Sequence, residues 1–433
     1  MGKFTKDSLI TLTTRVLQLV IGVGIYVIIA RVLGPEKNGI YFLAILLPAL
    51  LTIFTNFGLT SALVFHVGKN KYPLKEIFGT SVMFSISMSA SAVIMGSIII
   101  FFFSSKLFPG IEKNYLFLGL SLVPFKYFLN LIMNIWLGMQ KIEKYNFIQF
   151  FNTFIFLLLI AILLLGFHFG IKAAILAEFL SLFIASTFLF SGIKKEIGGI
   201  SFSLNKPLIK DFFSFGSRSY FSSVSQFLHL KIDIWMINIF LNPLAVGFYA
   251  VASLISEKIQ VISQSGGTVL FPKVAAETNG QKLRDFTPLV CRNILFVTFF
   301  VVLIIFLLSY WIIVLFYSEA YLYSVLPLRI LLIGTIGFSG YTVLTYDLSG
   351  RGRPIVNTYI AIASLILNIL LNIIFIPKFG IIGAAGATAI SYNIAFLIEL
   401  FFYSKISGNR IKDIIILKKS DLQFYKKFLL KNN

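Results

Sequence analysis

The stretch TFIFLLLIAILLL, residues 153–165, is an unbroken run of apolar side chains. Strands of membrane barrels are about 10 residues long and alternate in polarity, so a continuous run predicts a membrane-spanning helix. The whole chain of 433 residues has the same character, because 58% of it is hydrophobic and only 12% is charged. Soluble proteins carry about twice that charged fraction. The composition therefore excludes a soluble enzyme and predicts an all-α integral membrane protein.

Twelve stretches are long and apolar enough to be transmembrane helices, each needing about 20 mostly apolar residues. They lie at about 8–31, 40–67, 78–103, 114–138, 146–166, 171–190, 212–240, 244–271, 288–316, 324–348, 356–376 and 381–404. Several are separated by residues typical of turns, such as Gly34-Pro35 and Pro377 with Gly380. We therefore expect twelve transmembrane helices.

The excess of positive charge predicts the orientation. Lys and Arg number 37 against 17 Asp and Glu, a formal net charge of +20. With the N-terminus inside, most cations fall in cytoplasmic loops and in the tail 405–433, as the positive-inside rule requires. We expect a multi-pass protein of a bacterial or archaeal cytoplasmic membrane with both termini cytoplasmic. Nucleic-acid binders carry far more charged residues, so no nucleic-acid partner is expected.

Three pairs of segments indicate an internal repeat. LGPEKNGIY (33–41) is similar to LNPLAVGFY (241–249), an offset of 208 residues. LGMQKIEKYN (137–146) and LSGRGRPIVN (348–357) are offset by 211, and FGIKAA (169–174) and FGIIGAA (379–385) by 210. A nearly constant offset predicts two six-helix units. Because six is even, the units run parallel, related by an axis along the membrane normal.

The repeat predicts four parts of the chain. Residues 1–192 form an N-terminal six-helix bundle, 193–211 a cytoplasmic linker, and 212–404 a C-terminal six-helix bundle. Residues 405–433 alternate apolar side chains with many lysines, which is typical of an amphipathic helix on anionic lipid. A disordered basic tail is the alternative.

The segments ARVLGPEKNGIY (30–41), GRGRP (350–354) and LNILLNIIFIPKFGIIGAAGATAIS (367–391) resemble polysaccharide flippases of the O-antigen type. These belong to the multidrug/oligosaccharidyl-lipid/polysaccharide exporter superfamily, and the resemblance covers about residues 8–404. It implies two six-helix bundles in a V around a central cavity. It also implies alternating-access translocation of an undecaprenyl-pyrophosphate-linked oligosaccharide for cell-surface polysaccharide biosynthesis, a function without catalysis.

The same resemblance leaves other functions open. A lipid II flippase and a cation-coupled multidrug exporter belong to the same superfamily, and a channel or an assembly scaffold is a different class. The expected partners are the lipid-linked glycan, membrane lipids, and a polysaccharide polymerase or glycosyltransferases. The charge of the cavity distinguishes a flippase from a drug exporter. A basic cavity favours an anionic lipid-linked cargo, and an acidic N-terminal lobe favours drug export. Glu178 is the clearly intramembrane carboxylate of that lobe.

Polar residues recur at helical spacing on four of the expected helices, and we expect these faces to line the cavity. Ionisable residues in a membrane are costly, at about 2.5–3.5 kcal/mol or more, and usually face a cavity. The seventh helix places its polar residues in one sector roughly 100° wide. The polar positions are Thr11, Arg15, Gln18 and Tyr26 in the first helix, Thr52 and Asn56 in the second, Arg218, Ser222, Ser225, Gln226, His229 and Asp233 in the seventh, and Tyr249, Ser253, Ser256, Glu257, Gln260 and Gln264 in the eighth.

Cationic and amide residues of these faces predict a pyrophosphate and glycan site. Arg15 and Arg218 each lie about seven residues into a helix, about 10 Å from the cytoplasmic edge. A guanidinium stays charged and forks onto phosphate oxygens; the alternative is that both side chains snorkel to the interface. Lys126, after Pro124, is a second phosphate contact or else a buried partner of Glu178 or Glu399. The amides expected at the site are Gln18, Gln226, Gln260 and Asn56.

We expect the energy for transport to come from an ion that binds at a carboxylate. The sequence contains no Walker A loop, so we expect a coupling ion, H⁺ or Na⁺, at Asp233 or Glu257. His229 on the same face is a candidate to share a proton, or is a hydrogen-bonded structural residue. Asp233 is alternatively a charge partner of Arg218 or Lys231. The spacing of the three histidines predicts no metal site, and no other cofactor is expected.

Overall fold

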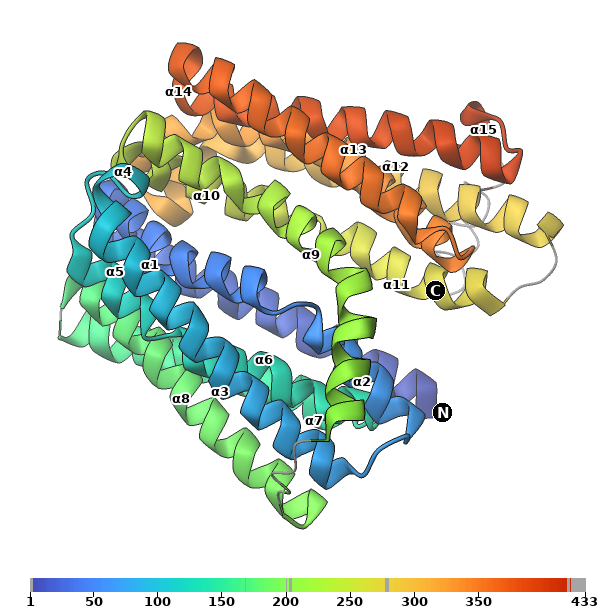
Figure 1. Ribbon diagram of the computed structural model, residues 1–433. Coiled ribbons are helices and arrows are strands. Elements are labelled where there is room, and N and C mark those ends of the chain that lie inside the picture. The colour runs from blue at the N-terminus through green and yellow to red at the C-terminus, as the bar shows by residue number, and fades with distance from the viewer. Residues whose placement is uncertain are drawn as a thin grey trace, which may run out of the picture. The chain divides into compact units, whose positions relative to one another are not determined.

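The computed structural model describes residues 3–167, 169–199, 201, 205–276, 280–418 and 421, and every regular element among them is a helix (Figure 1). The α-helices are α1 (Lys3–Thr55), α2 (Leu59–Lys69), α3 (Leu74–Ile98), α4 (Ser104–Leu107), α5 (Lys113–Leu120), α6 (Val123–Gly138), α7 (Ile142–Ile160), α8 (Gly170–Ile197), α9 (Lys206–Phe240), α10 (Pro243–Ile259), α11 (Val261–Ala276), α12 (Gly280–Ile312), α13 (Val325–Gly350), α14 (Pro354–Ser407) and α15 (Ile411–Ile415). Wider π-helical turns follow α3, α7 and α12 at Ile99–Phe103, Ala161–Gly166 and Ile313–Tyr317, and the 3₁₀ segment Glu319–Ser324 precedes α13.

Nine helical stretches within the described residues are long and apolar enough to cross a membrane. Two of them, α1 with 53 residues and α14 with 54, are much longer than one crossing. Each is interrupted by one glycine with a non-helical backbone, Gly34 at φ 71° and Gly380 at φ 60°. These interruptions lie between expected helices one and two, and eleven and twelve. The polar α9 is not among the nine, so the helical membrane protein is confirmed and the count of twelve stays a prediction.

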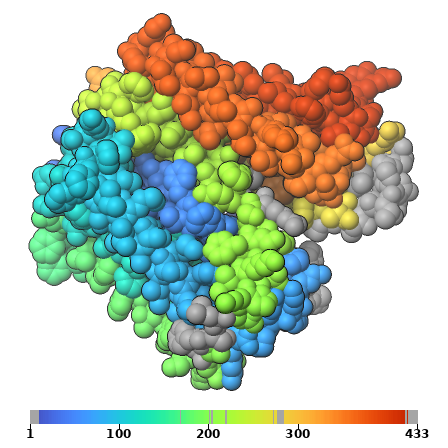
Figure 2. Space-filling model, viewed as in Figure 1, coloured from blue at the N-terminus to red at the C-terminus, as the bar shows by residue number. Residues whose placement is uncertain are grey.

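The surface of the chain agrees with a lipid environment. Large apolar side chains are exposed on several helices, among them Phe102, Leu307 and Trp311. Figure 2 shows one face of this surface. In water, a monomer rarely exposes large apolar patches. The exposed apolar side chains therefore mark where hydrocarbon chains, rather than water, surround the helices.

The expected second helix, 40–67, is broken, which corrects its assignment as one continuous span. The expected eighth helix, 244–271, lies within one candidate span, Pro243–Ala275. α1 ends at Thr55 and α2 begins at Leu59, with Phe57 and Gly58 in the left-handed region between them. In the C-terminal half, Gln260 separates α10 from α11. The first break lies between apolar segments, so a search for long apolar stretches does not reveal it, whereas the second lies among the polar residues Glu257, Lys258, Gln260 and Gln264.

Tyrosines satisfy the backbone that the first break exposes. The hydroxyl of Tyr127 donates to the carbonyl of Thr52 at 2.9 Å, and that of Tyr220 donates to the carbonyl of Phe54 at 2.7 Å. A broken helix at membrane depth is tolerated where neighbouring side chains satisfy the released backbone groups. Hydrogen bonds from two tyrosines therefore stabilise the break between α1 and α2.

The chain forms two compact units. Unit 1 comprises Met1–Phe227 and Asn242–Gly247, and unit 2 comprises Leu228–Leu241 and Phe248–Asn433. The first part of α9 belongs to unit 1, where Asp211 accepts hydrogen bonds from Lys71 at 2.6 Å and Tyr72 at 2.7 Å. The rest of α9 belongs to unit 2. The four-part division into 1–192, 193–211, 212–404 and 405–433 stays a prediction.

Within unit 1, the two copies of the first repeat motif pack on each other. Gly39 lies against the backbone of Pro243, and Gly247 lies against the backbone of Pro35. The two glycines correspond at the offset of 208, as do the two prolines. A Cβ atom on either glycine would overlap the facing carbonyl group. The contact is reciprocal, as expected where two equivalent elements meet about a two-fold axis.

The described part of the C-terminal tail packs on unit 2, and the amphipathic surface helix expected for 405–433 stays a prediction. α14 continues to Ser407, and the short α15 packs on α12 with Ile414 fully buried. The buried guanidinium of Arg292 donates to both carboxylate oxygens of Asp421, at 2.5 and 2.8 Å. Residues 419, 420 and 422–433 of the expected tail lie outside the described residues.

Candidate functional site

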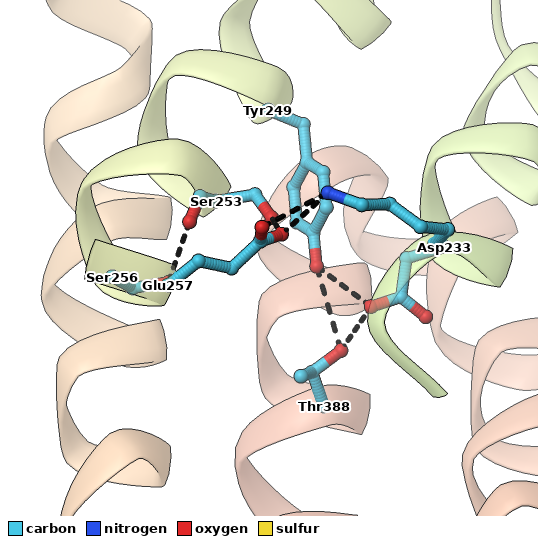
Figure 3. A network of polar contacts seen from close by, with 7 residues as sticks. Asp233, Tyr249, Ser253, Ser256, Glu257 and Thr388 are labelled. Carbon is cyan, nitrogen blue, oxygen red and sulfur yellow. Dashed lines mark hydrogen bonds and ion pairs between the residues drawn. The ribbon is translucent and has the colours of Figure 1, made fainter. Parts of the chain in front are cut away.

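Asp233 in α9 is buried inside unit 2, with 2% of its surface exposed. Tyr249 of α10 donates its hydroxyl proton to this carboxylate at 2.8 Å, and Asn372 of α14 donates its amide at 2.7 Å. The hydroxyl of Thr388, also in α14, completes the group (Figure 3). All three partners are neutral. A buried carboxylate is costly without a compensating charge, and these three partners of Asp233 do not supply one.

The two halves of α14 supply the polar surface that faces Asp233. Asn368 and Asn372 lie one turn apart, and the Asn372 amide donates to the Asn368 oxygen at 3.0 Å. The Asn368 amide in turn lies 3.3 Å from Thr388, which follows the interruption at Gly380. The Asn372 side-chain oxygen is buried without a hydrogen-bond partner. Carboxylate, amide and hydroxyl oxygens are the ligands that hard cations prefer.

His229 lies one turn before Asp233 in α9 and is also buried in unit 2. Its Nε2 lies 3.1 Å from the hydroxyl of Ser391 and 3.4 Å from that of Ser364, and its ring packs edge-on against Tyr392. The expectation that this polar face lines an open cavity is therefore wrong for His229 and Asp233. Polar residues of α14 cover both side chains within unit 2.

Glu257 in α10 is already paired. The ammonium of Lys231 lies 2.9 Å from both carboxylate oxygens, and Ser253 donates to one of them at 2.8 Å (Figure 3). Lys231 therefore partners Glu257, and the alternative that it neutralises Asp233 receives no support. Gln260, at the break between α10 and α11, is buried, whereas Gln226 is exposed.

In unit 1, Lys126 of α6 pairs with Glu178 of α8 at 2.8 Å. The hydroxyl of Tyr41, in the second half of α1, donates to the other carboxylate oxygen at 3.2 Å. Of the two expected partners, Lys126 therefore pairs with Glu178. The other, Glu399, accepts a hydrogen bond from Thr345 at 3.2 Å. The intramembrane carboxylate of this unit therefore carries its own counter-ion.

The remaining expected site residues do not join these clusters. Arg15 is exposed on α1 and Gln18 is half-buried one turn further along. Asn56 is half-buried at the break between α1 and α2, where its amide donates to Thr60 at 3.2 Å. Arg218 lies in α9, but its side chain is outside the described residues.

Solved structures share this fold. The inward closed conformation of the lipid II flippase MurJ superposes with a TM-score of 0.79 at 19% identity, covering 99% of this chain and 93% of that one. An inward-facing multidrug resistance MATE family transporter of the MOP superfamily gives 0.73 at 16% identity, covering 93% and 98%. The chain therefore has the same fold as these two solved structures.

The sequence comparisons identify the family to which the chain belongs. Residues 28–326 match the model of the family described as Polysaccharide biosynthesis protein, and the chain belongs to this family. It is 26% identical over 235 residues to the "Probable low-salt glycan biosynthesis flippase" of Haloferax volcanii, covering 50% of this chain and 49% of that protein. It is 22% identical over 402 residues to the "Putative O-antigen transporter" of Shigella flexneri, covering 87% and 92%.

An uncharacterized membrane protein of Methanocaldococcus jannaschii is 31% identical over 165 residues, 38% of this chain and 39% of that protein. The matches to this protein and to the Haloferax flippase thus span about two fifths and half of those relatives. The resemblance to polysaccharide flippases noted in the sequence is confirmed.

Sequence reasoning placed Asp233 and Tyr249 on polar helix faces but did not find the partners on α14. Asn372 and Thr388 are 139 and 155 residues away along the chain, beyond the reach of a helical-periodicity argument. A signal was nevertheless present, because Asn368 and Asn372 interrupt an otherwise apolar helix at a spacing of four. Polar residues on one face of such a helix indicate a polar partner elsewhere in the fold.

Proposed function

We propose that this protein flips an undecaprenyl-pyrophosphate-linked oligosaccharide across the cytoplasmic membrane by alternating access, as a step of cell-surface polysaccharide biosynthesis. The pairing of Lys126 with Glu178 at 2.8 Å carries the choice of an anionic cargo. An exporter of cationic drugs needs a free carboxylate to attract its cargo, and the intramembrane carboxylate of unit 1 is neutralised. The names of the Haloferax and Shigella relatives point the same way.

Two arginines are assigned to the pyrophosphate. Arg15 is exposed, so its guanidinium is open to a ligand. Arg218 is its expected counterpart at matching depth in the other repeat. Because a guanidinium remains charged and binds phosphate oxygens in pairs, two of them suit a pyrophosphate. The exposed Gln226 and half-buried Gln18 and Asn56 are assigned to the glycan.

Asp233 is assigned to the coupling ion, Na⁺ or H⁺. Its partners Tyr249, Asn372 and Thr388 are neutral, whereas Glu257 is held by Lys231. A carboxylate without a fixed counter-ion can take up and release a cation during transport, which a tightly paired carboxylate does not. His229 is assigned a structural role, because its Nε2 lies against the hydroxyls of two serines. Together with the lipid-linked substrate, a polysaccharide polymerase or glycosyltransferases are the expected partners.

Transport into proteoliposomes tests this function. A fluorescent polyprenyl-pyrophosphate glycan is placed in the membrane, and its appearance in the opposite leaflet is followed with a membrane-impermeant quencher, with and without a Na⁺ or pH gradient. We expect protein-dependent flipping that Arg15→Ala and Arg218→Ala each abolish. Lys378→Ala, which removes an exposed cation elsewhere, is the matched control.

Flipping equal to that of protein-free vesicles would contradict the proposal. So would full activity of both arginine variants. A second series with lipid II as substrate distinguishes the two flippase functions, and a cationic dye tests drug export. Faster transport of the dye than of the lipid-linked glycan would identify an exporter instead.

A further inference from the structure

The internal repeat places Glu178 of unit 1 at the position of Thr388 in unit 2. Gly170 and Gly380 are offset by 210 residues and have nearly the same backbone angle, φ 62° and 60°. The same offset relates Glu178 to Thr388. Tyr41 and Tyr249 correspond through the first repeat motif. Each unit therefore contains an equivalent pair, a tyrosine and a polar residue after the positive-φ glycine.

Both pairs are in contact. The hydroxyl of Tyr41 donates to Glu178 at 3.2 Å, and that of Tyr249 lies 3.4 Å from the hydroxyl of Thr388. Each tyrosine also donates to a carboxylate, which is Glu178 itself in unit 1 and Asp233 in unit 2. A tyrosine–carboxylate contact thus occurs in each repeat, although the carboxylates come from different positions: Glu178 corresponds to Thr388, and Asp233 corresponds to Ile25.

The two sites differ in what neutralises the carboxylate. In unit 1, the ammonium of Lys126 lies 2.8 Å from Glu178. Lys126 lies near the middle of the helical stretch Lys113–Gly138, so its charge is held deep in the membrane. In unit 2, the partners of Asp233 are the neutral Tyr249, Asn372 and Thr388.

We propose that Glu178 and Tyr41 form a second site for a small monovalent cation, which the ammonium of Lys126 fills permanently. This inference rests on the assignment of Asp233 to the coupling ion. A carboxylate at this depth requires a positive charge or a proton, and Lys126 supplies the charge from the chain itself. The consequence is that unit 2 exchanges a cation with the solution while unit 1 keeps a constant charge throughout the transport cycle.

Removing the ammonium should expose the site. The side chains of Lys126 and Glu178 are 19% and 15% exposed, so the pair is not sealed from small ions. In Lys126→Met, a Na⁺ ion or a proton takes the vacated position beside Glu178. The double variant Lys126→Met with Glu178→Gln removes the charge that would hold either cation. Lys172→Met, which removes an exposed lysine of the same unit, is the matched control.

Two measurements on the purified full-length chain test the proposal without any lipid substrate. The first is the number of radioactive Na⁺ ions bound per chain at pH 8. We expect Lys126→Met to bind one more ion than the wild type, and the double variant and Lys172→Met to bind no more than it. The second is thermal stability across pH. If a proton is preferred, the stability of Lys126→Met falls as the pH rises, because the buried carboxyl must then lose that proton.

Unchanged Na⁺ binding together with a wild-type pH profile in Lys126→Met would overturn the proposal. A gain that persists in the double variant would overturn it too, because Glu178 would then not be the ligand. If Lys126→Met does not fold, Lys126→Ala with added ethylammonium replaces it. Ethylammonium should stabilise Lys126→Ala and not Lys126→Ala with Glu178→Gln, and equal stabilisation of both refutes the site. Flippase activity enters none of these readouts, so a failure here is distinct from a failure of the proposed function.

Discussion

A single methyl group at Gly39 tests the reciprocal contact between the two repeat motifs. In Gly39→Ala, the new Cβ falls well inside van der Waals distance of the Pro243 carbonyl, which is backbone and cannot rotate away. Overpacking of this kind costs about 1–3 kcal/mol. Alanine also favours a helix over glycine by about 1 kcal/mol. Gly24→Ala, in the part of α1 that precedes the interruption at Gly34, shares that gain but meets no atom within 4 Å.

The difference between these two variants therefore isolates the contact. We expect Gly39→Ala to unfold about 1–3 kcal/mol more easily than Gly24→Ala. At about 2–4 °C per kcal/mol for a unit of roughly this size, its melting temperature should be about 2–12 °C lower. Gly247→Ala should show the same loss. Because the first methyl group already displaces the helix, the double variant should lose less than the sum of the two.

Tryptophan fluorescence during heating of the detergent-solubilised protein measures the effect. Equal melting temperatures for Gly39→Ala and Gly24→Ala would refute the reasoning, because the glycine would then not be needed for close approach. Strictly additive losses in the double variant would refute the reciprocity, because they would mean that the two glycines act at separate contacts.

Three further predictions concern charged groups. Asp233→Asn should lower gradient-driven flipping about 5- to 150-fold, the usual range of a coupling energy, while the melting curve remains cooperative; undiminished coupling would contradict the ion site. Lys71 holds the pKa of the Asp211 carboxyl below its usual value. The pair therefore stabilises the fold above about pH 4, and this stabilisation is lost as the pH falls through the lowered pKa. Asp211→Asn should remove that acid-dependent part of the melting profile. Arg292 likewise holds the pKa of Asp421 low, because the two side chains are paired. Without this pair, limited proteolysis of residues 405–418 in Asp421→Asn should be several-fold faster. Unchanged protection would contradict the docking of the tail.

Much of the fold was predictable because it depends on local physics. Long apolar runs predicted helices, and the residues around Gly34 and Gly380 predicted where the two longest helices are interrupted. The break at Phe57 and Gly58 was not predicted, because the apolar residues on both sides keep the hydropathy of the segment high. Only the tyrosine hydroxyls that receive the released carbonyls make that break stable, and they come from distant helices.

The site was predictable only in part, for a related reason. Helical spacing located Asp233 and His229 on one face of α9, but not what that face packs against. Lys126 was assigned both to phosphate and to Glu178, and the choice depended on whether two residues 52 positions apart meet in space. Contacts of this kind are set by how helices pack, and one sequence without its relatives does not record them.

The division of α9 between the two units has a mechanical consequence. Its beginning is held in unit 1 by the hydrogen bond between Lys71 and Asp211 and by the hydrogen bond from the Tyr220 hydroxyl to the carbonyl of Phe54. Its end carries Asp233 into unit 2. If Asp233 takes up the coupling ion, as proposed, α9 is the segment that joins this site through one helix to the contacts that hold its beginning in unit 1.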